Sequence, residues 1–214
     1  MIQKLFVLDT ETSGLDPEVH GILSLAGVVW IDGRIVECFE VYVREPGVGV
    51  DPESMAINKI DLAFIDKNGI EPKEVVERLE GFLSRFFDLH NKERVTIVCH
   101  NAAFDIPFLK SLYKRAGASF GRVFSHRAVD TAGILRFLIL AGRLPPSTGG
   151  SDEAFCFFDI EIPKKARHTA LGDAIGTARL LSKLLDFERR GFRPSSEVEG
   201  EMTAMRHLTP VLGT

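Results

Sequence analysis

The chain between residues 22 and 43 reads Ile22-Leu-Ser-Leu-Ala-Gly-Val-Val-Trp-Ile-Asp-Gly-Arg-Ile-Val-Glu-Cys-Phe-Glu-Val-Tyr-Val43. An Asp-Gly pair between two hydrophobic runs is typical of the two-residue turn of a β-hairpin, so Asp32-Gly33 predicts that the two runs pair with each other. An earlier apolar run begins at Lys4. Together these segments predict an antiparallel meander of three strands: Lys4–Leu8, Ile22–Ile31 and Arg34–Val43.

Helical and strand patterns alternate in the rest of the chain. Val95-Thr-Ile-Val-Cys99 is rich in β-branched residues and is typical of a buried strand. Apolar spacing and helix-terminating residues predict helices over Ser54–Lys59, Lys73–Leu89, Ala103–Ala116, Asp130–Ala141 and Thr169–Arg190. The Pro-, Gly- and Ser-rich stretch Pro145–Ser151 is expected to be a mobile loop. A meander followed by this alternation predicts an α/β fold, with a mixed sheet and helices on both of its faces.

The composition excludes several classes of protein. The 214 residues are 45% hydrophobic and 26% charged, which is typical of a globular domain and not of disordered, collagen-like or coiled-coil chains. No apolar run approaches the roughly 20 residues that span a bilayer, so we expect no membrane segment. Three cysteines without a Cys-x-x-Cys pair disfavour disulfides and a thiolate zinc site, and favour a cytoplasmic location. We expect one domain over residues 1–190 and a tail over residues 191–214, which either docks a partner or frays.

Charge is unevenly distributed along the chain. The 26 basic and 30 acidic residues give a net charge of −4, which disfavours a protein that simply coats nucleic acid. Between Ile106 and Ser151, however, Asp130 is the only acid. The cations of this window are Lys110, Lys114, Arg115, Arg122, Arg127, Arg136 and Arg143. Two interpretations have equal weight: a surface that follows phosphates, and ordinary solvated helix faces.

Three short segments combine acids with a histidine. Asp9 and Glu11 are two residues apart at the expected exit of a buried strand, where two like charges are costly unless a cation compensates them. Asp105 lies in the first turn of the helix after Cys99, and His168 precedes the last helix with Asp173 one turn in. Carboxylates without thiolates suit hard cations such as Mg²⁺ or Mn²⁺. With such ions bound, a polyanionic substrate could approach.

Three segments, in this order, resemble the motifs of the DnaQ-like DEDDh 3′–5′ exonucleases: Phe6-Val-Leu-Asp-Thr-Glu-Thr-Ser-Gly-Leu-Asp-Pro17, His100-Asn-Ala-Ala-Phe-Asp105 and His168-Thr-Ala-Leu-Gly-Asp173. The resemblance spans about residues 4–187. This family includes the epsilon proofreading subunit of bacterial DNA polymerase III. The resemblance implies a ribonuclease H-like fold with a mixed five-stranded sheet, and hydrolysis with two divalent cations, Mg²⁺ or Mn²⁺.

The resemblance also implies roles for individual residues. The metal ligands are expected to be Asp9, Glu11, Asp105 and Asp173. These four acids are also expected to be catalytic residues, together with His168 as the general base. The residues expected near the substrate are Thr10, Thr12, Asn58, Asn101 and Phe104. At Asn58 and Lys59 the family often has His-Gly instead.

The implied activity is release of 5′-mononucleotides from the 3′ ends of single-stranded DNA, with a role in proofreading. A 3′–5′ exoribonuclease is an alternative, because the same residues would serve it and nothing in the sequence reads a 2′-hydroxyl. A non-catalytic partner of a polymerase or of nucleic acid is another, although a binding protein has no need of repulsive carboxylates. Whether the chain acts alone or as a polymerase subunit is left open by the sequence.

Overall fold

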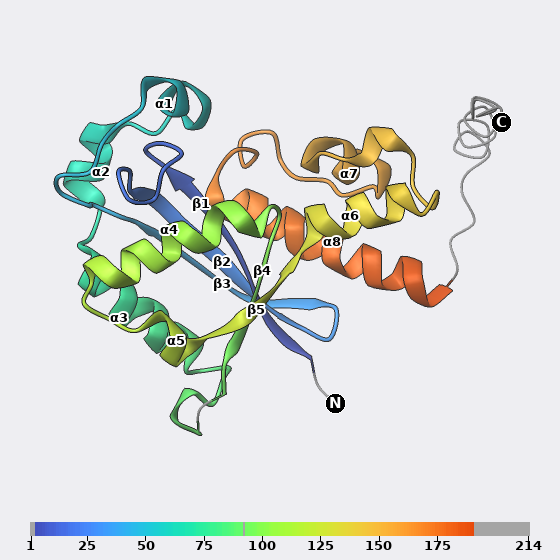
Figure 1. Cartoon of the computed structure of the whole chain (residues 1–214), viewed down its shortest axis with the longest axis horizontal. Coiled ribbons are helices and arrows are strands. Elements are labelled where there is room, and N and C mark those ends of the chain that lie inside the picture. Colours follow the sequence, from blue (N-terminus) through green and yellow to red (C-terminus); the bar gives the residue numbers. More distant parts are fainter. Residues whose placement is uncertain (1–2, 92, 191–214) are drawn as a thin grey trace, which may run out of the picture.

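The computed structural model describes residues 3–91 and 93–190, and its centre is one mixed sheet (Figure 1). The strands are β1 (Lys4–Thr12), β2 (Ile22–Ile31), β3 (Arg34–Tyr42), β4 (Val95–Cys99) and β5 (Phe124–Asp130). In the sheet they lie side by side in the order β3-β2-β1-β4-β5. β2 is antiparallel to β1 and β3, whereas β4 is parallel to β1 and β5. The predicted α/β class with a mixed five-stranded sheet is confirmed.

Helices connect the strands and cover them. Between β3 and β4 the chain forms α1 (Pro52–Asn58), α2 (Leu62–Asn68), α3 (Pro72–Leu83) and the 3₁₀ turn η1 (Leu89–Asn91). The helices around β5 are α4 (Ala102–Arg115), α5 (Phe120–Val123) and α6 (Thr131–Leu140). They are followed by η2 (Pro146–Thr148), α7 (Ser151–Phe157) and α8 (Ala170–Arg190). Across residues 3–91 and 93–190, no helix is both long and apolar enough to span a membrane.

The alternation of side chains along β1 separates two hydrophobic cores. Phe6 and Leu8 are fully buried in the large core that the sheet forms with α3 and α4. Val7 points to the opposite face, where it packs with Trp30 of β2 and Leu181 of α8. Helices therefore cover both faces of the sheet, as expected (Figure 1).

A third core holds α6 and α7 against α8. Leu135 of α6 and Phe155 of α7 pack together with Leu180 of α8. The Phe155 ring lies so close to α8 that a Cβ on Gly176 would be 2.5 Å from it. α6 and α7 therefore form a layer alongside α8 (Figure 1).

The largest differences in length from the prediction are in two elements, the first strand and the helix α3. β1 does not end at Leu8, because its pairing with β2 continues through Asp9 and Glu11, opposite Ala26 and Ser24. The two acids thus lie within a paired strand and not after it. The helix expected over Lys73–Leu89 ends at Leu83, because the Ser84 hydroxyl donates to the Gly81 carbonyl at 2.8 Å and the chain continues in turns.

Other differences lie in the second half of the chain. The prediction of a mobile loop at Pro145–Ser151 is wrong. This segment contains η2, and Thr148 is buried, with its hydroxyl donating to the Pro145 carbonyl at 2.7 Å. β5 and α7 were not located from the sequence. β5 is an edge strand in which only Phe124 is buried, so no apolar pattern marks it. The predicted tail, residues 191–214, lies outside the described residues.

The close approach of Phe6 to Gly27 yields a first prediction. A Cβ on Gly27 would be 2.3 Å from the Phe6 ring, so Gly27→Ala should lower the free energy of unfolding by about 1–3 kcal/mol through overpacking. Gly81 is an exposed residue of α3 with open space around its Cβ position. Gly81→Ala should therefore raise the free energy of unfolding, by about 0.5–1 kcal/mol. Urea unfolding of both variants measures this, and a Gly27→Ala variant as stable as the parent chain would contradict the packing.

Candidate active site and metal centre

Three carboxylates meet at the C-terminal end of β1. Asp9 and Glu11 share one face of the strand, and Asp173 lies in the first turn of α8. Each offers one oxygen, and these oxygens all lie within 4.8 Å of one another. All three residues are partly buried. We call this group the acidic cluster.

The fourth predicted acid, Asp105, is held beside the acidic cluster by β1. It lies in the first turn of α4 and is 3% exposed. Its Oδ1 accepts hydrogen bonds from the backbone N–H of Thr10 at 3.0 Å and from the Thr10 hydroxyl at 2.8 Å. These bonds orient the carboxylate and join α4 to β1. The charge of Asp105 helps to raise the pKa of Asp9, so the two carboxylates are in electrostatic contact.

Asp130, at the end of β5, positions the start of α4. Its carboxylate accepts hydrogen bonds from the backbone N–H groups of Asn101 at 3.0 Å and Ala102 at 3.2 Å. It also caps α6, accepting from Ala132 at 3.0 Å and Gly133 at 3.4 Å. Sequence reasoning missed this role. The signal available was an isolated acid in an otherwise basic stretch.

Burial raises the pKa values of all four acids, and repulsion by their neighbours adds to the shift at Asp9 and Glu11. Burial is the largest cause at each position, and it raises the pKa of Glu11 to about 8 and that of Asp105 to about 7. The pKa of Asp9 is raised well above its usual range by burial and then by the charges of Asp105, Asp173 and Glu11. Burial also raises the pKa of Asp173. Full ionisation of the group is therefore unfavourable unless a cation is present.

The donor set fits a divalent cation that prefers oxygen. The acidic cluster offers three carboxylate oxygens at a mutual distance that one ion can share. Mg²⁺ and Mn²⁺ bind such ligands and complete their shells with water or phosphate oxygens. The raised pKa values also favour a cation site, because a bound cation would offset the repulsion that causes part of the shift at Asp9 and Glu11.

Arg167 contacts the acidic cluster and was not predicted as a site residue. Its side chain is 15% exposed, and its Nη1 donates to Oδ1 of Asp173. Its charge lowers the pKa values of Asp9, Glu11 and Asp173, against the effect of burial. The only signal in the sequence is a cation next to His168, in Lys164-Lys-Ala-Arg167. The sequence does not indicate which of these three cations turns inward.

His168 lies on the connection that precedes α8, next to Asp173. Its side chain is exposed, its backbone is left-handed (φ 59°), and its backbone hydrogen-bonds to Asp173. A Cβ on Gly172 would be 1.8 Å from the carbonyl oxygen of Ala166. Only glycine fits this approach, so Gly172 allows the connection to lie against the first turn of α8.

The residues predicted near the substrate border the same region. Thr12 follows Glu11, and its carbonyl accepts a hydrogen bond from Nδ2 of Asn58 at 2.9 Å, which joins α1 to β1. Asn58 is followed by Lys59 in a left-handed conformation (φ 57°), which explains why glycine suits that position. Asn101 is exposed at the start of α4. Half-buried Phe104 packs against Phe108, with 5.1 Å between ring centroids.

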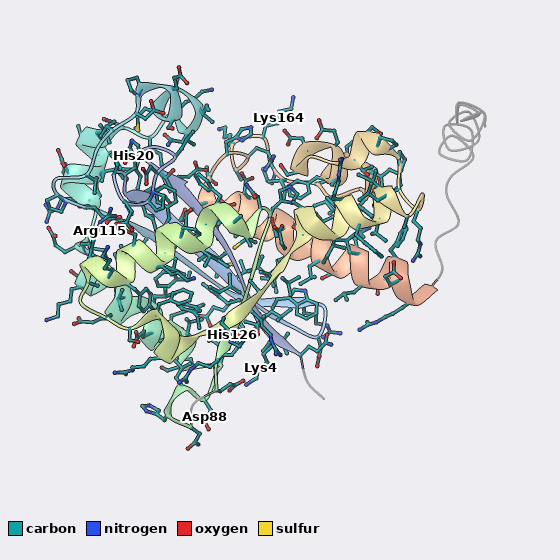
Figure 2. All side chains as sticks on the ribbon, in the orientation of Figure 1. Lys4, His20, Asp88, Arg115, His126 and Lys164 are labelled. Carbon is teal, nitrogen blue, oxygen red and sulfur yellow. The ribbon has the colours of Figure 1, made fainter. Side chains whose placement is uncertain are left out.

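The basic window between Ile106 and Ser151 serves in part as structural support. Lys114 pairs with Glu18 at 3.1 Å, Arg115 with Glu45 at 2.6 Å, and Arg143 with Glu188 at 2.8 Å. Arg115 also donates to the His20 carbonyl at 3.0 Å, and Figure 2 shows both residues at the same end of α4. For the other cations of the window, a phosphate-following surface stays a prediction.

Comparison with known proteins identifies the family. Residues 6–181 match the RNase_T family, described as exonuclease, and the chain belongs to this family. A similar curated protein is the DNA polymerase III subunit epsilon-like protein of Rhodobacter capsulatus, 33% identical over 84% of this chain and 23% of that protein. Ribonuclease T of Blochmanniella pennsylvanica is 28% identical over 86% of this chain and 85% of its own length. The chain thus spans about a quarter of the first relative and most of the second.

Solved structures agree with this assignment. Exonuclease X in complex with 5′ overhanging duplex DNA is 25% identical, with a TM-score of 0.59 over 93% of this chain and 99% of that one. The nuclease domain of 3′hExo, a DEDDh family member bound to rAMP, shares the fold at 16% identity, with a TM-score of 0.69 over 86% of this chain and 92% of that one. The predicted ribonuclease H-like fold is confirmed. The predicted enzyme class is confirmed at the level of the family as an exonuclease.

The raised pKa values predict how stability depends on pH. Glu11 and Asp105 keep protons in the folded protein above their ordinary pKa values of 4.5 and 3.8, up to about 8 and 7. The metal-free protein should therefore lose stability, measured as a lower Tm, as pH rises from about 5 to 8.

Thermal unfolding of chelator-treated protein measures this loss. Added Mn²⁺ should raise Tm more at pH 8 than at pH 5, because the ionised carboxylates bind it. Glu11→Gln cannot ionise and should reduce the pH dependence. If added Mn²⁺ does not change Tm at pH 8, the proposal of a metal centre is contradicted.

Proposed function

We propose that the chain is a metal-dependent exonuclease that removes 5′-mononucleotides from the 3′ ends of single-stranded DNA. The observation that carries this proposal is the meeting of Asp9, Glu11 and Asp173 within 4.8 Å, with Asp105 in electrostatic contact. Alone, such a group repels a polyanion, whereas divalent cations bound to it would attract one. Membership of the exonuclease family supports the same chemistry.

Each group of the site has a distinct role in this proposal. Asp9, Glu11, Asp105 and Asp173 would hold two ions, Mg²⁺ or Mn²⁺, which when bound supply Lewis-acid stabilisation of the charge on phosphate oxygens. His168 accepts the proton of the attacking water, because it is exposed beside Asp173 and imidazole exchanges protons near neutral pH. The two hydrogen bonds from Thr10 keep the carboxylate of Asp105 oriented.

The terminal nucleotides would contact residues on both sides of the acidic cluster. Thr10 and Thr12 flank Glu11 on β1, and Asn58 is bonded to Thr12 at 2.9 Å. Asn101 and Phe104 lie at the start of α4, which also carries Asp105. A single strand suits these positions because its last bases can separate and stack on an aromatic ring.

Two comparisons support different substrates. Exonuclease X, 25% identical, was solved with 5′ overhanging duplex DNA, which supports DNA. Ribonuclease T of Blochmanniella pennsylvanica, matched over 85% of its length, supports a second candidate function, a 3′–5′ exoribonuclease. Both activities would use the same carboxylates and His168.

A proofreading role beside a polymerase is part of the proposal. It is supported by the 33% identity to an epsilon-like protein of which this chain spans 23%. We also propose a cytoplasmic location, because Cys38, Cys99 and Cys156 are free thiols.

Substitution of a ligand and of the base tests the proposed roles. Asp9→Asn should reduce nuclease activity below detection without lowering Tm, because it removes a metal ligand and also a buried like charge. His168→Ala should lower turnover by about 10²–10⁴-fold while Mn²⁺ binding is retained. The matched control is Asp186→Asn, which alters an exposed Asp-x-Glu pair on α8 and should change activity by less than about twofold. Full activity of Asp9→Asn would exclude the metal mechanism, and full activity of His168→Ala would place the base elsewhere.

Degradation of matched oligonucleotides tests polarity and substrate. With Mn²⁺ present, we expect 5′-labelled single-stranded DNA to shorten from its free 3′ end, and a 3′-blocked strand to be protected. The RNA strand of the same sequence should be degraded more slowly. Faster loss of the RNA strand would favour the exoribonuclease, and cleavage within the blocked strand would rule out an exonuclease.

A further inference from the structure

Arg167 connects the acidic cluster to α7. On one side, its Nη1 donates to Oδ1 of Asp173. On the other side, its Nε and Nη2 donate to Oδ1 of Asp152 at 2.9 and 2.5 Å, and Nη2 also donates to the Ser151 hydroxyl at 3.3 Å. The guanidinium lies 5.0 Å from the centroid of the Phe155 ring. All three nitrogens of this largely buried cation are therefore engaged.

We propose that Arg167 is an intrinsic cation that competes with divalent metal ions for Asp173. In the metal-free protein the guanidinium neutralises part of the acidic cluster. When a metal ion binds Asp173, Arg167 releases that carboxylate and stays on α7 through Asp152 and Ser151. This inference rests on the proposed function, because it requires Asp173 to be a metal ligand.

Electrostatics makes the two cations mutually exclusive at Asp173. The charge of Arg167 lowers the pKa values of Asp9, Glu11 and Asp173, so its field extends over the whole acidic cluster. The same field repels another cation at that place, and the interior of a protein screens this repulsion weakly. Removal of Arg167 therefore favours metal binding even though it costs the metal-free protein an ion pair.

α7 provides a fixed second position for the guanidinium. Phe155 is 4% exposed and packs on α8 next to Gly176. Asp152 and Ser151 lie one turn earlier on the same helix. Arg167 can thus lose one hydrogen-bond partner and retain two, together with the aromatic ring, without leaving its place.

The neighbouring cations of the connection supply a matched control. Lys164 and Lys165 are exposed and form no ion pair within residues 3–91 and 93–190. Figure 2 shows Lys164 projecting outward from the connection. Lys164→Gln therefore removes the same charge as Arg167→Gln from nearly the same point of the chain, but not the contact with Asp173.

Calorimetric titration with Mn²⁺ measures the competition without any activity assay. Arg167→Gln should bind Mn²⁺ about tenfold more tightly than the parent chain, because a charge-assisted hydrogen bond no longer has to be broken. Lys164→Gln should differ from the parent by less than about twofold, since exposed charges are screened. Arg167→Lys retains the positive charge but lacks the planar guanidinium that bonds to two acceptors at once. It should therefore show a smaller gain in Mn²⁺ affinity. Circular dichroism verifies the folding of each variant, and Arg167→Lys decides the question if Arg167→Gln does not fold.

A double-mutant cycle separates competition from a simple change of charge. Asp152→Asn removes the negative charge of the second acceptor and weakens its hydrogen bonds with Arg167, so Arg167 depends more on Asp173 and Mn²⁺ binding should weaken by about threefold. In the Arg167→Gln background, Asp152→Asn should change the affinity by less than about twofold. A long-range effect of the Asp152 charge would instead weaken binding equally in both backgrounds.

The outcomes distinguish this inference from the proposed function. Unchanged or weaker Mn²⁺ binding by folded Arg167 variants, or an equal effect of Asp152→Asn in both backgrounds, would overturn the competition and leave the metal site intact. If the parent chain does not bind Mn²⁺, or if Asp173→Asn binds it as tightly as the parent, the proposed metal site itself fails.

Discussion

The repulsion among carboxylates that are held together at the end of β1 is the constraint to which the surrounding structure responds. The strand that carries Asp9 and Glu11 is buried between two cores, so water cannot fully solvate their charges. Hydrogen bonds from Thr10 stabilise Asp105, and Arg167 supplies a positive charge at Asp173. Burial and the remaining repulsion together keep the pKa values of Asp9 and Glu11 raised. The donor set of the acidic cluster fits a divalent cation, which would offset this repulsion.

The geometry of the site depends on residues outside the three motifs. The carboxylate of Asp130 joins the starts of α4 and α6. It thereby positions the first turn of α4, which carries Asp105. The absence of a side chain at Gly172 lets the connection before α8 approach the helix. Asn58 joins α1 to the end of β1 through its hydrogen bond to the Thr12 carbonyl. Each contact links a segment that carries chemistry to a segment that does not.

Much of this could be predicted because the sequence patterns are local. The Asp32-Gly33 turn and the apolar runs around it predict the meander, and the motif residues predict the acids that meet. What could not be predicted depends on contacts between distant segments. β5 lacks an apolar pattern because it lies at the edge of the sheet, and α7 is short and is held by packing on α8. Arg167 could not be told from Lys164 and Lys165, because only the fold determines which cation turns inward.

The acids of the site are supplied by the first strand, by a helix in the middle of the chain and by the last described helix. α8 packs on β1 through Leu181 and supplies Asp173, so the site requires a segment that the ribosome makes after the other two. A nascent chain that has not yet released α8 carries Asp9, Glu11 and Asp105 but has no completed centre.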